Sequence, residues 1–358
     1  MRKKILIIDD SALMRRVLSD IIDADERFTT IAAVANGKEA LAYLEENSDM
    51  QAILLDLNMP VLDGVGFMKE YNARGYNIPV FIVSAIASQS GKETIEALEL
   101  GAVDFIAKPR SLADVRSGPF ANKLLTVLDL ISQSSLNSRP VVPIPERKTA
   151  KPVDTYAPMR KASGGSCRKL VAIACSTGGP KALKEVIPFL PKNLDAPVLI
   201  VQHMPEGFTL SLANRLNELS EITVKEAADG DKLCKGVVYI AKGGSQMRLI
   251  PQPDGVGIRI TKEPPRGGLR PCADIMYESL DECNVQEYTC VVLTGMGSDG
   301  ARGIKQLKQT KTVYTIAQNE PTCTVYGMPK AIADQGLADE VLPLGDVADA
   351  IVKKVGVH

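Results

Sequence analysis

Three residues that could together carry out acyl transfer each follow a short apolar run of the chain. They are Ser176, His203 and Asp299, and the runs before them are residues 171–175, 198–201 and 290–293. A serine hydroxyl attacks a carbonyl carbon when a histidine takes its proton and a carboxylate orients that histidine. The chain therefore contains the parts of a serine nucleophile with its base, a mechanism that needs no cofactor.

Each of the three residues also has an ordinary structural interpretation. Ser176 could bond only its own turn, His203 could be a structural histidine, and Asp299 could cap the helix that follows it. The chain has two histidines, and the other, His358, is the last residue of the sequence, where chain ends fray. His203 is therefore the only candidate base for Ser176.

The sequence around Ser176 predicts a strand that breaks into a tight turn and then a helix. Gly178 and Gly179 permit the sharp turn, and Pro180 suits the first position of a helix. Ligands of open α/β sheets bind at the carboxyl ends of the strands, which is where Ser176 would lie. Backbone N–H groups near Thr177 and Met296 are the candidates for stabilising an oxyanion.

A second group of polar residues falls at strand ends in the first third of the chain. The group comprises Asp9, Asp10, Asp56, Ser84 and Lys108. Three carboxylates at one sheet edge repel one another unless a hard cation neutralises them, and Mg²⁺ fits because it prefers oxygen ligands. A lone acidic pair after a strand is usually a cap or a loop feature, but polar groups at the ends of four strands indicate a site.

The elements that must position these residues alternate between short apolar runs and amphipathic stretches. In the first part we expect strands at 4–8, 29–34, 52–55, 80–83 and 104–107, and helices at 12–23, 37–46, 63–71, 91–100 and 121–133. In the last part we expect strands at 169–174, 197–201, 223–226, 290–293 and 313–317, a β-meander at 237–241, 247–250 and 257–261, and helices at 181–190, 211–219, 273–281, 300–308, 330–335 and 346–355. The pattern predicts two doubly wound α/β domains with parallel sheets, the second with an antiparallel insertion.

Composition limits the classes of protein and places a linker between the two domains. The 358 residues have a formal net charge of -1, so no overall field favours nucleic acid. Residues 134–166 are basic and rich in proline, serine and glycine, which predicts an extended tether between domains at 1–133 and 167–358. The seven cysteines include no CxxC pair, and no apolar run is long enough to span a bilayer. We therefore expect a cytoplasmic protein with reduced thiols and no membrane insertion.

The first third of the chain resembles the receiver domain of two-component response regulators, a flavodoxin-like fold. The resemblance is carried by four segments, namely Ile8-Asp9-Asp10-Ser11, Leu55-Asp56-Leu57-Asn58-Met59-Pro60, Val83-Ser84-Ala85 and Ala107-Lys108-Pro109. It implies that Asp56 is the phosphoacceptor. It also implies that Asp10, Asp56 and the carbonyl of Asn58 bind Mg²⁺, that Asp9 supports the metal through water, and that Lys108 and Ser84 contact the phosphoryl group. Phe105 departs from the tyrosine that many receivers carry.

The last part of the chain resembles the catalytic domain of chemotaxis protein-glutamate methylesterases, a Rossmann-like fold. The matching segments are Ser176-Thr177-Gly178-Gly179-Pro180, Gln202-His203-Met204-Pro205, Arg270-Pro271-Cys272-Ala273-Asp274, Leu293-Thr294-Gly295-Met296-Gly297-Ser298-Asp299-Gly300 and Tyr326-Gly327-Met328-Pro329. The family usually has serine at the position of Cys272. The resemblance implies demethylation of glutamate methyl esters and deamidation of glutamines on chemoreceptors, with a chemotaxis histidine kinase as phosphodonor. It also implies that the receiver restricts access until Asp56 is phosphorylated.

Other classes of protein are less well supported by the sequence. The chain lacks the GxGxxG motif of a dinucleotide site after its first strand, the GK[ST] of a P-loop and a zinc ligand set. A response-regulator transcription factor would need a basic recognition helix after the linker, and none is found. A non-catalytic phosphorylation-dependent scaffold and an esterase with a different substrate remain open.

Overall fold

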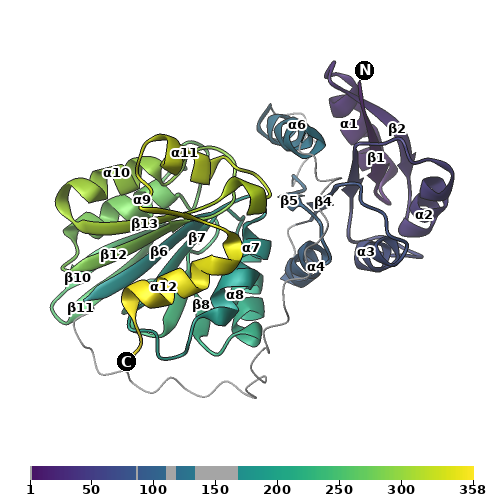
Figure 1. The fold of residues 1–358 in the computed structure, drawn as a ribbon. Helices are drawn as coiled ribbons and strands as arrows, with labels where there is room; N and C mark the ends of the chain where they lie inside the picture. The colour runs from purple at the N-terminus through teal and green to yellow at the C-terminus, as the bar shows by residue number, and fades with distance from the viewer. Residues whose placement is uncertain (1, 86–87, 110–117, 134–167) are drawn as a thin grey trace. The chain divides into compact units, whose positions relative to one another are not determined.

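The computed structural model describes residues 2–85, 88–109, 118–133 and 168–358. The chain divides into two compact units, Met1–Pro145 and Glu146–His358, which are considered separately (Figure 1). The division falls within the predicted linker, whose residues lie outside the described part of the chain. No helix in that described part combines the length and the apolar composition that a bilayer span requires.

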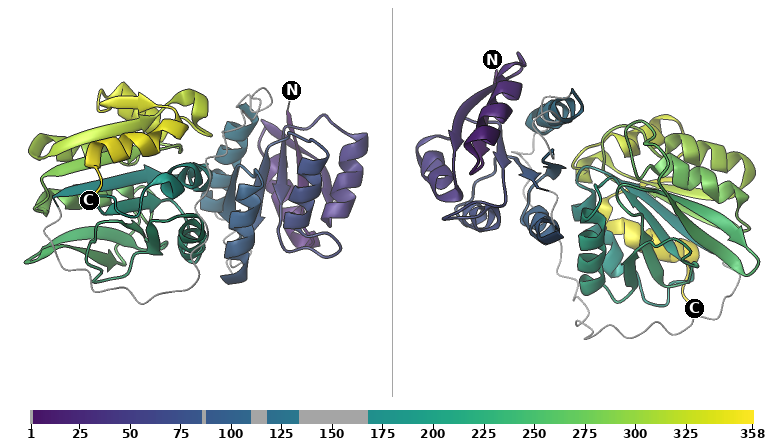
Figure 2. Two further views of the ribbon diagram at one scale, coloured as in Figure 1. Left: turned by 60° about the horizontal axis from the view of Figure 1, so that its bottom comes forward. Right: turned by 180° about the vertical axis from the view of Figure 1, so that it is seen from behind.

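The first unit is built on a parallel sheet of five strands in the order β2-β1-β3-β4-β5. The strands are β1 (Lys3–Ile8), β2 (Phe28–Val34), β3 (Ala52–Leu55), β4 (Val80–Ser84) and β5 (Asp104–Ala107). The helices are α1 (Ala12–Asp23), α2 (Gly37–Glu46), α3 (Gly64–Ala73), α4 (Ser88–Glu99) and α6 (Gly118–Gln133). Helices cover both faces of the sheet (Figure 2). Buried side chains of α1 and α6 form one core cluster with those of β1, β3 and β4.

Short polar side chains begin several of these helices directly after strand-end loops. Ser11 accepts a hydrogen bond from Met14 N at the start of α1, and Asp63 accepts one from Gly66 N at the start of α3. Asn36 and Glu39 form a reciprocal capping pair at the start of α2. These caps fix where each helix leaves the carboxyl edge of the sheet.

The second unit is built on a parallel sheet of seven strands in the order β14-β13-β12-β6-β7-β9-β8. The strands are β6 (Lys169–Cys175), β7 (Val198–Gln202), β8 (Thr223–Glu226), β9 (Val237–Ile240), β12 (Glu287–Val292), β13 (Thr312–Gln318) and β14 (Glu340–Leu342). A separate hairpin pairs β10 (Gln246–Gln252) with β11 (Gly255–Thr261). The central strand β6 is almost fully buried, as its uninterrupted apolar sequence predicts.

Helices cover both faces of this second sheet (Figure 1). They are α7 (Gly179–Val186), α8 (Phe208–Leu219), α9 (Ala273–Ser279), α10 (Ala301–Thr310), α11 (Met328–Asp334) and α12 (Val347–Val355). Single turns of 3₁₀-helix lie at Ile187–Phe189, Leu280–Glu282, Glu320–Thr322 and Leu344–Asp346. Side chains of α9, α10, α11 and the hairpin form one core cluster with one face of the sheet.

The predicted β-meander is wrong. The strand predicted at 237–241 is β9, which pairs in parallel with β7 and β8 inside the main sheet. Among the strands of the described residues, β10 and β11 alone form the antiparallel insertion. The physical reason is the composition of β9: all four of its residues are buried, so it needs a covered position between two strands and not a place in an exposed hairpin.

Candidate active site

The ends of β6 and β7 bring Ser176 and His203 side by side. Cys175 and Gln202 are register partners in the parallel sheet, and His203 N donates to Cys175 O over 3.2 Å. Ser176 and His203 are therefore opposite each other, one residue past the last paired residues of β6 and β7. Neighbouring strands lie about 5 Å apart, so the two side chains start within reach of each other. Ser176 is half-buried.

The backbone of Ser176 is held from both neighbouring strands. Ser176 N donates to Thr294 O over 3.0 Å, and Ser176 O accepts from Gln202 Nε2 over 3.0 Å. The chain then turns at Gly178, whose φ of +77° suits glycine, and α7 begins with Pro180 in its first turn. The predicted strand, tight turn and helix are confirmed here.

The imidazole of His203 is oriented by Asp299. His203 Nε2 lies 2.7 Å from Asp299 Oδ2, and both side chains are more than nine-tenths buried. The Nε2–H is therefore directed at the carboxylate, which leaves Nδ1 as the nitrogen that can accept a proton. Within the described residues, no hydrogen bond joins the imidazole to Ser176 Oγ. Such contacts are often long before substrate binds and tighten in the complex.

Asp299 is a well-satisfied buried carboxylate. Besides His203, it accepts from Ala273 N at 2.6 Å, Asp274 N at 3.0 Å and Cys272 Sγ at 3.2 Å. Burial by itself would raise the pKa of Asp299, but the hydrogen bonds from His203 and the backbone amides outweigh it and lower the pKa to about 2. Asp299 is thus a fixed anion that can stabilise a protonated His203. It caps α9 and not the helix that follows it.

The two backbone N–H groups expected to form an oxyanion hole belong to the residue after Ser176 and to the loop after β12. Thr177 is buried directly after the serine, and its carbonyl accepts from Thr294 Oγ1 over 3.0 Å. Met296 lies in the loop that leads from β12 to Asp299, and this residue is 37% exposed. Among the hydrogen bonds of the described residues, none uses the N–H of Thr177 or Met296.

Sequence reasoning did not assign three polar residues that support this site. Gln202 holds Ser176 O, Gln318 Oε1 accepts from Thr294 N over 2.8 Å, and Asp274 binds two amides at the start of α10. Gln202 and Asp274 both lie within the motifs that carried the resemblance. The motif order could mark them as special, but only coordinates show that their partners are backbone groups far along the chain.

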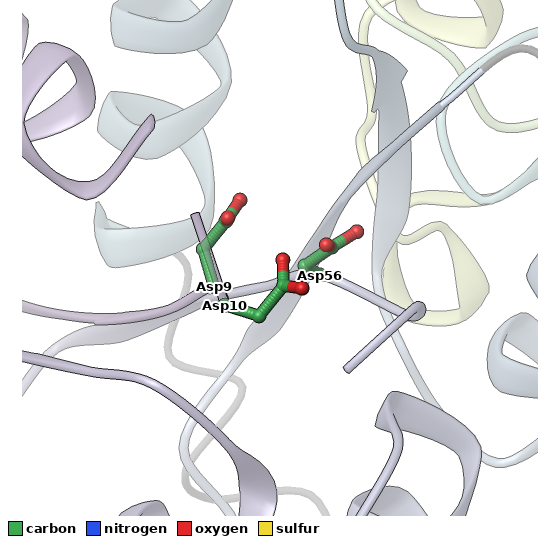
Figure 3. A group of neighbouring side chains, drawn as sticks. All are labelled: Asp9, Asp10 and Asp56. Carbon is green, nitrogen blue, oxygen red and sulfur yellow. The ribbon is translucent and has the colours of Figure 1, made fainter. Parts of the chain in front are cut away.

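A second site lies at the carboxyl edge of the first sheet. Carboxylate oxygens of Asp9, Asp10 and Asp56 lie within 4.8 Å of one another, at the ends of β1 and β3 (Figure 3). Lys108 Nζ lies 2.7 Å from Asp9 Oδ2 and 2.7 Å from Asp56 Oδ2. These are oxygen donors of the kind Mg²⁺ binds, so the residues present fit that ion.

The charges at this second site are buried and strongly coupled. Burial raises the pKa of Asp56, and the neighbouring ammonium of Lys108 only partly offsets this. Burial would lower the pKa of Lys108, but Asp56 and Asp9 outweigh it and raise that pKa. Additional positive charge would therefore stabilise the ionised form of Asp56.

The other receiver residues singled out from the sequence lie on β4, on β5 and in the loop after β3. Ser84 ends β4 and is buried, and its hydroxyl lies 3.4 Å from Thr94 Oγ1 of α4. Asn58 is exposed two residues beyond Asp56, and Phe105 is buried in β5. The structure thus brings the predicted carboxylates and Lys108 into direct contact, with Ser84 on the adjoining strand.

The folds and the two sites define the class of protein: a receiver-like α/β domain followed by an α/β domain that brings a serine, a histidine and an aspartate to one sheet edge. Residues 5–117 match the family model "Response regulator receiver domain", and residues 171–351 match "CheB methylesterase". The chain belongs to the CheB methylesterase family. It is accordingly a methylesterase with an attached receiver domain, which confirms the predicted fold class and enzyme class.

Relatives with known names extend over almost the whole chain. A protein of Halalkalibacterium halodurans named protein-glutamate methylesterase/protein-glutamine glutaminase is 41% identical over 357 residues, covering 99% of this chain and 98% of the relative. A Bacillus subtilis protein of the same name is 40% identical, covering 98% of each chain. The crystal structure of the Thermotoga maritima CheB methylesterase catalytic domain matches with a TM-score of 0.51 and 42% identity, covering 52% of this chain and 98% of that domain.

Proposed function

We propose that residues 167–358 hydrolyse γ-methyl esters of glutamate, and amides of glutamine, on the helical cytoplasmic part of chemoreceptors. Residues 1–133 form the receiver that controls this activity, and 134–166 form the linker. The hydrogen bond of 2.7 Å between His203 Nε2 and Asp299 Oδ2, one register step from Ser176, is the observation that carries the proposal. This hydrogen bond orients the imidazole of His203, the proposed base, at the sheet edge that also carries the Ser176 hydroxyl.

In the proposed reaction Ser176 Oγ attacks the ester carbonyl carbon while His203 Nδ1 takes its proton. The N–H groups of Thr177 and Met296 stabilise the oxyanion of the tetrahedral intermediate. As the intermediate collapses, the proton passes from His203 to the leaving oxygen and methanol departs. Water then attacks the acyl-serine, His203 again takes and returns the proton, and glutamate is released. With a glutamine substrate the leaving group is ammonia.

The receiver site supports phosphorylation of Asp56. We propose that Asp9, Asp10 and Asp56, with the carbonyl of Asn58, hold Mg²⁺, which would neutralise charge on the phosphoryl oxygens. Lys108 already contacts Asp56 and would pair with the phosphoryl group, while Ser84 would donate a hydrogen bond to it. A chemotaxis histidine kinase would be the phosphodonor, since receiver domains accept phosphoryl groups from such kinases.

Replacing the nucleophile tests the catalytic part of the proposal. Ser176→Ala removes the only atom that forms the acyl bond, so methanol release from methylated receptor should fall by at least about 10³-fold with folding unchanged. The matched control is Ser211→Ala, since Ser211 is a surface serine of α8 whose hydroxyl contacts only Gly207 O, at 3.5 Å, among the described residues. A Ser176→Ala enzyme with wild-type turnover would eliminate the serine mechanism.

A further inference from the structure

Two carboxylates link the starts of α9 and α10. Each belongs to one of the two helix starts and accepts hydrogen bonds from backbone amides of the other. Asp299, which precedes α10, accepts from Ala273 N and Asp274 N at the start of α9. Asp274, in the first turn of α9, accepts through Oδ1 from Gly300 N at 3.0 Å and Gly303 N at 2.7 Å at the start of α10. Each carboxylate therefore fixes the segment that carries the other.

The loop that carries Asp299 has no cap of its own. The residue before α10 is Gly300, with a φ of +96°, and it offers no side chain to the first amides of that helix. Asp274 supplies the missing acceptor from a different element. The position of Asp299 relative to His203 therefore depends on a carboxylate that touches neither His203 nor Ser176 within the described residues.

Close packing of α9 against α10 holds the partners of these hydrogen bonds together. A Cβ added at Gly303 would lie 2.8 Å from Tyr277 Cβ and 2.9 Å from Asp274 O, so α9 and α10 approach at a position that only glycine permits. Arg302 lies over the same side, with its guanidinium 3.0 Å from Glu278 and 3.7 Å from Asp274 Oδ2. The contact is tight enough to transmit a displacement of one helix start to the other.

We infer that Asp274 is a positioning residue of the esterase reaction. It holds the start of α10, and through it the Asp299 carboxylate, at hydrogen-bond distance from His203 Nε2. Loss of this acceptor would let the Asp299 loop shift, and a displacement of about 1 Å at a catalytic group can cost about a hundredfold in rate. Asp274 does not line a substrate surface, since its side chain is 13% exposed and lies between the helices. The effect should therefore fall on kcat and not on KM. This inference depends on the proposed function.

The test compares Asp274→Ala with Asp274→Asn in the full chain, with methanol release as the readout. Asp274→Ala should lower kcat about tenfold to a hundredfold with KM unchanged. Asp274→Asn should restore kcat to within about threefold of wild type, because its carbonyl oxygen can accept the same two N–H bonds. Asp339→Ala is the matched control, since Asp339 binds Thr315 N and Lys308 Nζ and its loss should cost stability without lowering kcat.

Three outcomes would overturn the inference. They are a folded Asp274→Ala enzyme with kcat within twofold of wild type, an Asp274→Asn enzyme as slow as Asp274→Ala, and a fall in kcat for Asp339→Ala that matches the fall for Asp274→Ala. If Asp274→Ala does not fold, Gly303→Ala tests the same link, because its methyl group separates the helix starts; a folded variant with unchanged kcat would also refute the inference. Ser176→Ala in the same assay separates the two proposals, since full activity in that variant would refute the serine mechanism itself.

Discussion

The Asp299 carboxylate has a structural and a chemical role, since it caps α9 and also orients His203. It receives four donors, from His203, Cys272, Ala273 and Asp274. Burial raises the pKa of the Cys272 thiol to about 12, with the charge of Asp299 adding to the effect, so Cys272 remains protonated as a donor. The thiol therefore supplies a fourth donor toward Asp299.

The lowered pKa of Asp299 predicts a pH-dependent contribution to stability. Its folded-state pKa of about 2 lies below the ordinary value of 3.8, so ionised Asp299 stabilises the fold above pH 4, and this stabilisation is lost as the pH falls through about 2. A shift of this size corresponds to about 2 kcal/mol at neutral pH. The gap in unfolding free energy between wild type and Asp299→Asn should thus be larger at pH 7 than at pH 3.

Urea unfolding of the full chain at the two pH values measures this gap. Asp334→Asn is the control, because the Asp334 side chain is 61% exposed and its substitution should change stability little at either pH. A gap between wild type and Asp299→Asn that is equal at pH 7 and pH 3 would contradict a strongly depressed pKa in the folded state.

At the residue scale the sequence indicated which side chains could carry out catalysis, but not which residues hold those side chains in place. Ser176, His203 and Asp299 could be selected because a nucleophile needs a base and only one internal histidine was available. Asp274 and Gln202 bind backbone groups, and any segment offers such groups. Residue types alone therefore cannot show which acceptor meets which amide, because that pairing depends on how helices and strands pack.

The turn between β3 and α3 contains the clearest backbone strain of the described residues. Leu62 N donates to Pro60 O over 2.8 Å, and the residue between them, Val61, has a φ of +70° and is 79% exposed. This is the strained form of the three-residue turn, and a β-branched side chain is poorly tolerated in it. The strain lies five residues beyond Asp56, at the edge that carries the phosphorylation site.

Relief of this strain should stabilise the first unit. Val61→Asn should raise the free energy of unfolding of the receiver by about 1 kcal/mol, because asparagine adopts positive φ more readily than valine. Val61→Thr is the matched control, since threonine makes the position polar but keeps the β-branch and hence the strain. Chemical unfolding monitored on the receiver transition measures both variants. Equal stability of the asparagine and threonine variants would show that the backbone of this turn is not strained.

At the element scale the sequence predicted the strand–helix alternation but not every strand pairing. The apolar runs that became β1, β3, β6 and β7 were located within one or two residues, since a buried parallel strand needs such a run. The error at β9 came from expecting this strand to pair with β10, the next strand along the chain, in a meander. The ten residues between β8 and β9 instead allow the chain to cross over, so that the two strands pair in parallel.

At the scale of the whole molecule each unit has its own sheet and its own core. The sequence could predict both, because the alternation of elements and the change in composition between them are local features. It could not predict how one unit acts on the other, because the pattern of apolar and polar residues within a unit reports only the packing of that unit. Regulation by the receiver must therefore be tested by separating the units and by blocking the phosphoacceptor.

If the unphosphorylated receiver restricts access to Ser176, its removal should activate the enzyme. A fragment of residues 167–358 should release methanol faster than the unphosphorylated full chain. A small phosphodonor with Mg²⁺ should raise the rate of the full chain toward that of the fragment and leave the fragment unchanged. Asp56→Asn in the full chain should stay at the basal rate with the donor, because it lacks the carboxylate that accepts the phosphoryl group.

Asp49→Asn is the control, since Asp49 is an exposed carboxylate paired with Lys4 and should leave activation intact. A fragment no faster than the full chain would show that the receiver does not inhibit. Full activation of Asp56→Asn would show that the phosphoryl group acts at another residue.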